Sequence, residues 1–200
     1  MQADATGAAS EARDALADIG RALARLEGRA VDLTLLTAAE TGALDVSLQR
    51  RALRAVAQAA ASDARARAAR FGLTLRCDVS ACRDATARID LDLMRHALGA
   101  LLDNAIRFSP TGAPVTLVAE RDGEWGRFIV RDQGAGILPD DVPNIFKPFA
   151  VGANEDEARD SGLGLGLAVA RAIAEAHNGR LRVLSEMGPG AAVAIELPLA

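Results

Sequence analysis

Apolar residues recur at alternating steps of three and four along the first part of the chain, with polar residues between them. The apolar positions are Leu16, Ile19, Leu23, Leu26, Ala30 and Leu33. This spacing predicts a helix over residues 11–40 with one narrow apolar seam, which is typical of a helix that packs along another helix. The seam could also lie on the core of its own domain, but charged side chains cover the rest of the helix. A partner helix from another subunit or another segment is therefore favoured.

The helical pattern stops in residues 41–47, where Gly42 is a stop signal and Ser47 is a candidate N-cap for a following helix. We expect a domain boundary here. It divides the chain into a helical segment, residues 1–44, and a second domain, residues 45–200.

The second domain alternates between helical and strand-like periods, separated by turn residues. Helices are predicted at 48–70, 90–108, 139–146 and 163–177, and strands at 73–79, 87–90, 114–121, 125–132, 180–186 and 191–198. Residues 150–161 are polar and carry no apolar period. The order predicts an α+β fold, a two-layer α/β sandwich in which helices cover one face of a mixed sheet.

Composition narrows the function further. Half of the residues are hydrophobic, the formal net charge is −4 and the pI is about 5.3, so nucleic acid is not an expected partner. Cys77 and Cys82 lack the neighbours of a zinc site and are expected to be reduced thiols. No membrane segment or secretion signal is visible in the sequence. We expect a cytoplasmic location, either as a free protein or as the cytoplasmic part of an inner-membrane protein.

A glycine run is the strongest candidate for chemistry. Gly162, Gly164 and Gly166 alternate with leucines and lead directly into an apolar-periodic helix. A helix start offers unpaired N–H groups and a partial positive charge, which bind phosphate. The run has neither the Gly-Lys-Ser/Thr ending of a P-loop nor the preceding strand of a dinucleotide fingerprint. Alone, it is also compatible with a purely structural turn.

Three further stretches support a nucleotide site. Asn104 and Arg107 lie about one turn apart on a predicted helix, so both can face one ligand. Asp132 follows a strand and precedes two glycines, and an Ile-Phe-Lys-Pro-Phe stretch at 145–149 precedes the polar segment. Each feature has a structural explanation by itself, such as a helix cap or a turn. Their joint occurrence in this order favours a nucleotide site.

In this order the four stretches resemble the N box, first glycine box, F box and second glycine box of the sensor histidine kinases. The resemblance covers roughly residues 45–198 and implies the Bergerat ATP-binding fold. Residues 11–40 resemble, more loosely, the second helix of the family's dimerisation and histidine-phosphotransfer hairpin. The resemblance also implies ATP and Mg²⁺ as ligands, a homodimer formed through the N-terminal helix, and a response regulator as partner.

The resemblance assigns roles to individual residues. Asn104 would provide an amide oxygen for Mg²⁺ and Arg107 would neutralise phosphate charge, which makes these two the catalytic residues. Asp132 would accept a hydrogen bond from the exocyclic amine of adenine. The complete set expected to bind nucleotide is Asn104, Arg107, Phe108, Asp132, Gly134, Gly136, Ser161, Gly162, Leu163, Gly164, Leu165 and Gly166. Phe108 could equally be a core residue.

The segment around the glycine run is expected to move. Residues 150–161 are interpreted as a lid that orders around nucleotide, and Phe146 and Phe149 as anchors of its hinge.

Two features depart from the family pattern. Ala100 stands where an earlier asparagine of the N box is usual, and this turn of the helix lacks the glutamate that activates water in the hydrolytic relatives. That absence fits phosphoryl transfer to a protein group better than ATP hydrolysis. The two histidines, His96 and His177, are not in a phosphoacceptor box, and His177 is better explained as a helix cap.

The sequence thus predicts the ATP-binding catalytic region of a histidine kinase whose phosphoacceptor histidine is not in this chain. The chain is then either a fragment of such a kinase or a kinase that phosphorylates a histidine elsewhere. The alternatives are a serine kinase that restrains a sigma factor, and a non-catalytic phosphotransfer or scaffold protein on the same fold.

Overall fold

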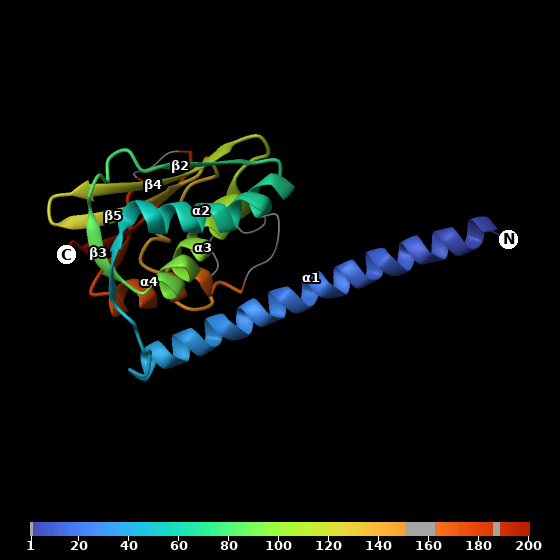
Figure 1. Cartoon of the computed structure of the whole chain (residues 1–200), viewed down its shortest axis with the longest axis horizontal. Coiled ribbons are helices and arrows are strands. Elements are labelled where there is room, and N and C mark those ends of the chain that lie inside the picture. The colour runs from blue at the N-terminus through green and yellow to red at the C-terminus, as the bar shows by residue number, and fades with distance from the viewer. Residues whose placement is uncertain (1, 151–162, 186–188) are drawn as a thin grey trace.

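The computed structural model describes residues 2–150, 163–185 and 189–200. A 39-residue helix, α1, precedes an α+β domain and extends well beyond it (Figure 1). In chain order the elements are α1 Gln2–Glu40, β1 Gln49–Ala52, α2 Leu53–Arg70, β2 Thr74–Asp78, β3 Thr86–Ile89, α3 Leu91–Phe108, β4 Pro114–Asp122, β5 Trp125–Arg131, α4 Gly166–Ala176, β6 Arg180–Val183 and β7 Ala192–Pro198.

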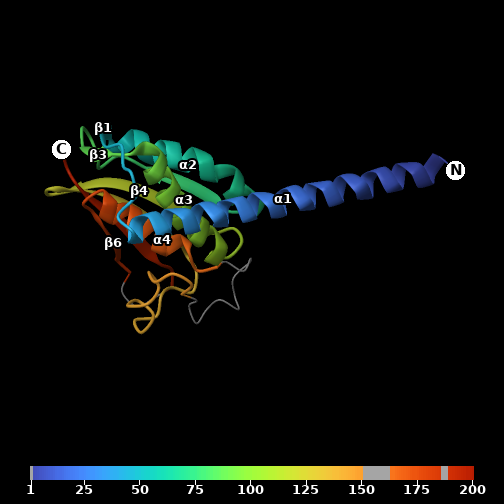
Figure 2. The same ribbon diagram turned by 90° about the horizontal axis from the view of Figure 1, so that it is seen from below.

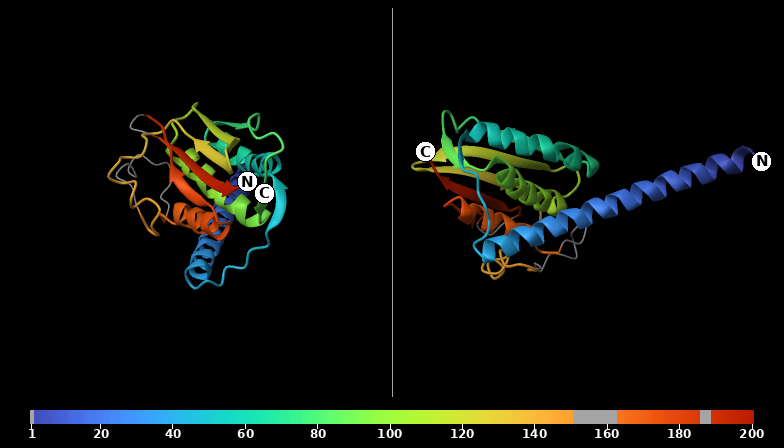
Figure 3. Two further views of the ribbon diagram at one scale, coloured as in Figure 1. Left: turned by 90° about the vertical axis from the view of Figure 1, so that its left-hand side faces the viewer. Right: turned by 60° about the horizontal axis from the view of Figure 1, so that its bottom comes forward.

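The domain has two layers, as predicted. A five-stranded mixed sheet has the order β2-β4-β5-β7-β6, in which only the β2–β4 pair is parallel. The helices α2, α3 and α4 cover one face of this sheet (Figure 3). A separate antiparallel pair joins β1 to β3.

The core lies between the sheet and its helices, and it follows from the period of each element. The strands β4, β5 and β7 send alternate residues inward, among them the fully buried Leu117, Phe128 and Ile195. The buried side of α3 includes Met94, Leu98 and Leu102 at four-residue spacing. Alanines dominate the buried side of α2, so this helix can approach the sheet closely.

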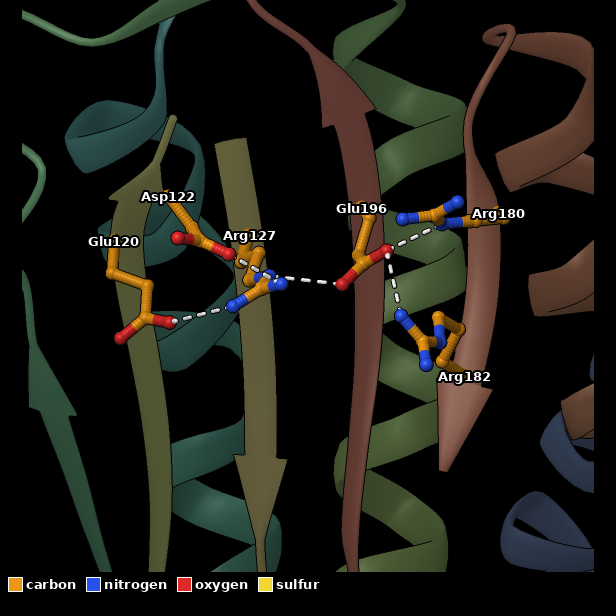
Figure 4. Close-up of polar contacts among 6 residues, drawn as sticks. All are labelled: Glu120, Asp122, Arg127, Arg180, Arg182 and Glu196. Carbon is orange, nitrogen blue, oxygen red and sulfur yellow. Dashed lines mark hydrogen bonds and ion pairs between the residues drawn. The ribbon is translucent and has the colours of Figure 1, made fainter. Parts of the chain in front are cut away.

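Charged side chains occupy part of the uncovered face of the sheet (Figure 4). Glu196 on β7 is fully buried, and its carboxylate accepts hydrogen bonds from Nε of Arg127 at 2.9 Å and Nε of Arg180 at 2.5 Å. Arg182 lies 3.9 Å away, and Arg127 also pairs with Glu120 and Asp122. This charged cluster holds three acids, Glu120, Asp122 and Glu196, and three arginines, Arg127, Arg180 and Arg182.

Asp90 joins three segments at the base of the helical layer. Its carboxylate caps α3 by accepting from the N–H groups of Asp92 and Leu93, and it also accepts from the N–H of Ser47 in the linker that follows α1. The N–H of Asp90 donates to Nε2 of His177, the C-cap residue of α4. The start of α3, the end of α4 and the linker therefore meet at one residue.

This contact explains His177. Because Nε2 accepts from the Asp90 N–H, the ring proton lies on Nδ1, which donates to the carbonyl of Ile173 at 2.7 Å. The predicted capping role is confirmed, and the buried ring is fully used by the fold.

Two predictions about the start of the domain are wrong. The helix predicted at 48–70 begins only at Leu53, because residues 49–52 pair with β3 and the Leu53 N–H donates to the carbonyl of Ala85. Ser47 is not its N-cap. The residue before the helix is Ala52, which makes no side-chain cap.

Two further boundaries need correction. Residues 139–146 form successive turns in place of a helix, in line with Pro143, which cannot donate a backbone hydrogen bond. The helix predicted at 163–177 is shorter and begins at Gly166, because Gly164 has φ +66° and so lies outside helical geometry.

Candidate functional site

A cavity of about 660 Å³ opens between α3, the start of α4 and one side of α1. From the predicted site, its lining includes Asn104, Arg107, Phe108, Asp132, Gly136, Leu163, Gly164, Leu165 and Gly166. The structure therefore brings residues 104–108, 132–136 and 163–166 to one place, although they are far apart in the sequence. Ser161 and Gly162 lie outside the described residues, as does the predicted lid beyond Ala150.

Asp132 is held at one end of this cavity by the backbone. Its Oδ1 accepts the N–H of Gly134 at 2.9 Å and the N–H of Ala191 at 3.0 Å. Among the described residues, both hydrogen bonds to this carboxylate go to Oδ1. Oδ2 can therefore accept a hydrogen bond from a ligand. Burial raises the pKa of Asp132, and these two N–H groups counter that effect only in part.

The end of the cavity that holds Asp132 lies at the C-terminal end of α3. A Cβ added to Gly134 would come within 2.6 Å of the carbonyl oxygen of Phe108, the last residue of that helix. Phe108 is half-buried and lines the cavity, and the guanidinium of Arg107 lies 5.1 Å from the centre of its ring. A flat, partly apolar surface therefore stands beside the Asp132 carboxylate.

The start of α4 forms the other end. Gly164 has φ +66°, and a Cβ there would overlap the backbone of Ala150, so no other residue fits without a shift. Its carbonyl accepts the N–H of Phe149 at 3.0 Å, so the end of the 145–149 stretch is bonded to the glycine run. Leu165, Gly166 and Leu167 at the start of α4 line the cavity, and a helix start offers unpaired backbone N–H groups to an anion.

Ala100 is the nearest part of α3 to this helix start. A Cβ added to Gly166 would lie 3.4 Å from Cβ of Ala100. The line from Asp132 to the start of α4 thus runs along α3 toward its N-terminus, passing Arg107 and Asn104 on the way. A ligand with a base at Asp132 would place its phosphates beside Asn104, Ala100 and Gly166.

The two phenylalanines of the 145–149 stretch behave differently. Phe146 packs against the core, whereas Phe149 is 61% exposed and has φ +62°. Both adjoin the cavity wall formed by Ile145 and Ala150. Their predicted role as hinge anchors stays a prediction.

Sequence reasoning missed several residues of the site. Gly190 was interpreted only as a turn residue and Ala191 only as the start of a strand, yet the Gly190 N–H donates to the carbonyl of Gly134 at 2.7 Å and the Ala191 N–H holds Asp132. The cavity wall also includes Gly28, Arg29 and Asp32 of α1. No local signal reveals such contacts, because they depend on how distant segments pack.

An anchored carboxylate, a helix start with glycines and an amide side chain thus line one cavity. A family model identifies the class of protein. Residues 89–200 match the family described as histidine kinase-, DNA gyrase B- and HSP90-like ATPases, and the chain belongs to this family.

Relatives and solved structures narrow the class. The chain is 35% identical over 188 residues to the virulence sensor protein BvgS of Bordetella bronchiseptica, covering 91% of this chain and 15% of that protein. The crystal structure of full-length ShkA in complex with AMPPNP has a TM-score of 0.72 at 29% identity, covering 84% of this chain and 35% of ShkA. The Acinetobacter baumannii histidine kinase AdeS has a TM-score of 0.68 at 26% identity, covering 85% and 76%.

These findings confirm the predicted fold class and the predicted resemblance to the ATP-binding catalytic region of two-component sensor histidine kinases. The predicted enzyme class agrees with the names of the relatives. The chain spans between 15% and 27% of the length of the curated relatives BvgS, SenX3 and PfeS. Among the described residues, no helix is both long and apolar enough to cross a membrane.

Proposed function

We propose that this chain is the nucleotide-binding catalytic region of a histidine kinase, which transfers the γ-phosphoryl group of ATP to a histidine outside this chain. From there the group would pass to a response regulator, in the cytoplasm. The observation that carries the proposal is the Asp132 carboxylate, anchored through Oδ1 with Oδ2 left for a base, at the opposite end of the cavity from the start of α4.

The carboxylate gives base selectivity. An ionised carboxylate only accepts hydrogen bonds, so it suits the exocyclic amine of adenine and repels the carbonyl oxygen at the matching position of guanine. Arg107 beside Phe108 would meet the negative charge of the phosphates. Adenine nucleotides are therefore the expected ligands.

The residues present also fit Mg²⁺. Magnesium binds through few protein ligands and keeps waters and substrate phosphates in its shell. Asn104, half-buried on the cavity wall, offers one amide oxygen there. Among the described residues no group of three or more acidic, histidine or cysteine side chains could hold a metal by itself. The cation would arrive with the nucleotide and neutralise phosphate charge.

The proposed reaction needs positioning more than acid–base chemistry. A histidine ring nitrogen would attack the γ-phosphorus in line with the leaving ADP oxygen, forming the P–N bond as the P–O bond breaks. The start of α4 and Arg107 would stabilise the charge that develops on the oxygens.

Dimerisation through α1 belongs to the same proposal. The seam residues Leu16, Ile19, Leu23, Leu26 and Leu33 are between 44% and 67% exposed. Burying them against a second copy would remove a continuous apolar stripe from water. The match to BvgS over 91% of the chain extends into α1, which favours a histidine kinase over a sigma-factor serine kinase.

The test is calorimetric titration with a non-hydrolysable ATP analogue and Mg²⁺. We expect binding by the wild type, weaker binding of the GTP analogue, and loss of binding in Asp132→Asn, which replaces half of the acceptor surface by a donor. Asp92→Asn is the matched control, because Asp92 lies on the same cavity rim with its side chain 94% exposed. A folded wild-type protein that binds no nucleotide would refute the proposal, as would equal losses in both variants.

A further inference from the structure

The helix α1 makes contacts on two different sides. Near its C-terminal end it lies alongside α4 and α3 (Figure 2), where Leu36 is buried and Leu35 packs against the core. At about 100° per residue, Asp32 lies about 150° around the helix from the centre of the apolar seam, and Leu36 lies about 110° from it. One side of α1 therefore faces its own catalytic domain, and the seam beside it is left for a second helix.

A polar pair holds the side of α1 that faces the catalytic domain against α3. Nε2 of His96, on α3, lies 2.7 Å from Oδ1 of Asp32, on α1. Their side chains are 32% and 21% exposed, so water screens this contact less than it screens the exposed ion pairs of the surface. Both residues line the nucleotide cavity.

The position of His96 along α3 relates this pair to the expected position of the phosphates. His96, Ala100 and Asn104 follow at intervals of four residues and share one face of the helix. A nucleotide with its base at Asp132 would run along this face toward the N-terminus of α3, with phosphates at Asn104 and Ala100. His96 lies one turn further in the same direction, about 6 Å along the axis. The terminal phosphate would therefore emerge next to the Asp32–His96 pair.

The family's usual asparagine is replaced at the preceding turn. Ala100 has no polar atom with which to hold a phosphate or to fix an approaching group. The polar groups on this wall beyond Asn104 include His96 and Asp103, and Asp103 is bound to Nε of Arg67 at 2.6 Å. His96 is bound to α1 instead, so it links the phosphate end of the cavity directly to that helix.

Resting on the proposed function, we propose that Asp32 and His96 are positioning residues for phosphoryl transfer. The pair holds α1 at the mouth of the cavity where the terminal phosphate emerges. A phosphoacceptor helix that packs on the apolar seam of α1 is thereby kept in register with the nucleotide. The pair acts through α1 and does not itself receive the phosphoryl group.

The experiment compares Asp32→Ala, His96→Ala and His96→Gln, with Glu175→Ala as matched control. Glu175 pairs with Arg171 at the same 2.7 Å, but within α4. Each variant is assayed for binding of the ATP analogue and for hydrogen exchange of the α1 amides between Gly28 and Leu36. The rate of phosphoryl transfer is measured at saturating ATP to a supplied single helix that carries a histidine followed by an acidic residue.

We expect the two alanine variants to transfer roughly ten- to a hundredfold more slowly, since small displacements of reacting groups have effects of this size. Nucleotide affinity should change less than about twofold, because the base and phosphate sites are untouched. Exchange in α1 should accelerate. His96→Gln should recover most of the rate, because its amide N–H can still donate to Asp32. Glu175→Ala should match the wild type.

The proposal is overturned if nucleotide affinity falls as much as the transfer rate, if α1 exchange is unchanged in both alanine variants, or if the phosphoryl label is found on His96 itself. A wild type that binds the ATP analogue but transfers to no histidine refutes the proposed function. If the proposed function is refuted in this way, hydrogen exchange of α1 that stays unchanged in both alanine variants would independently refute the proposal that Asp32 and His96 hold α1 in place.

Discussion

Replacing Glu196 by glutamine should destabilise the domain far more than replacing Glu175, although both carboxylates pair with arginines at similar distances. Glu196 is fully buried and accepts hydrogen bonds from two arginines, whereas the side chains of Arg171 and Glu175 are 51% and 55% exposed. The perturbation removes one negative charge without changing the volume of the side chain.

The magnitude follows from the two hydrogen bonds to Glu196. Charge-assisted hydrogen bonds contribute about 1.5–3 kcal/mol each. Arg180 and Arg182 are about half exposed and regain water when the charge is lost, and Arg127 keeps its acidic partners Glu120 and Asp122. The glutamine amide still accepts one bond but directs an NH₂ at the other arginine. We therefore expect a loss of about 2–3 kcal/mol for Glu196→Gln, and less than about 0.5 kcal/mol for Glu175→Gln.

Thermal unfolding followed by circular dichroism at pH 7 measures both. For a chain of this size the midpoint should fall by about 6–9 °C in Glu196→Gln and by under about 2 °C in the control. Burial raises the pKa of Glu196, but the Arg180 hydrogen bond and the charges of Arg180, Arg127 and Arg182 outweigh it and lower that pKa below 4.5. The carboxylate thus stabilises the fold above pH 4.5, and the difference from the variant should vanish as the pH falls through the folded-state pKa. Equal losses in the two variants would refute the reasoning.

Three further outcomes are expected. Gly164→Ala should weaken binding of the ATP analogue at least about tenfold in calorimetry, because a Cβ overlaps Ala150 and φ is +66°; unchanged affinity would exclude this loop from the phosphate site. Nucleotide affinity should begin to fall at a higher pH than an ordinary aspartate would give, because burial raises the pKa of Asp132 and protonation places a donor O–H where the adenine amine needs an acceptor; an affinity that falls only at the pH expected of an ordinary aspartate would contradict this. Leu23→Asp with Leu26→Asp should shift the protein toward monomer in analytical ultracentrifugation, and a dimer that persists would place the interface elsewhere.

How far the sequence predicts this molecule depends on whether the information is local. The seam of α1 and the strands β4 and β5 all follow from period and turn chemistry. β1 was missed because its four residues become a strand only by pairing with β3, which is far away in the sequence. The helix predicted at 139–146 is wrong because the range contains Pro143, which cannot donate a backbone hydrogen bond, and the residues form turns.

The candidate site also contains residues that the local sequence identifies and residues that only the packing of distant segments reveals. Asn104, Arg107 and Asp132 were identified from spacing and residue type, and the structure places them around one cavity. Ala191 could not be identified in this way, because any residue can supply a backbone N–H to Asp132. The contribution of Asp32 depends on where a separate helix docks, which no motif within α3 records.

The junction at Asp90 has a mechanical consequence for the cavity. The helices α3 and α4 run in opposite directions and are joined there, at the end remote from Ala100 and Gly166. Ten residues of helix separate that junction from the phosphate site, a lever arm of about 15 Å. Turning one helix by about 5° at Asp90 would open the phosphate site by about 1.3 Å, the displacement that such an arm gives. The linker from α1 ends at the same residue, so a small rotation transmitted through it to the Asp90 junction would be enlarged at the far end of this arm.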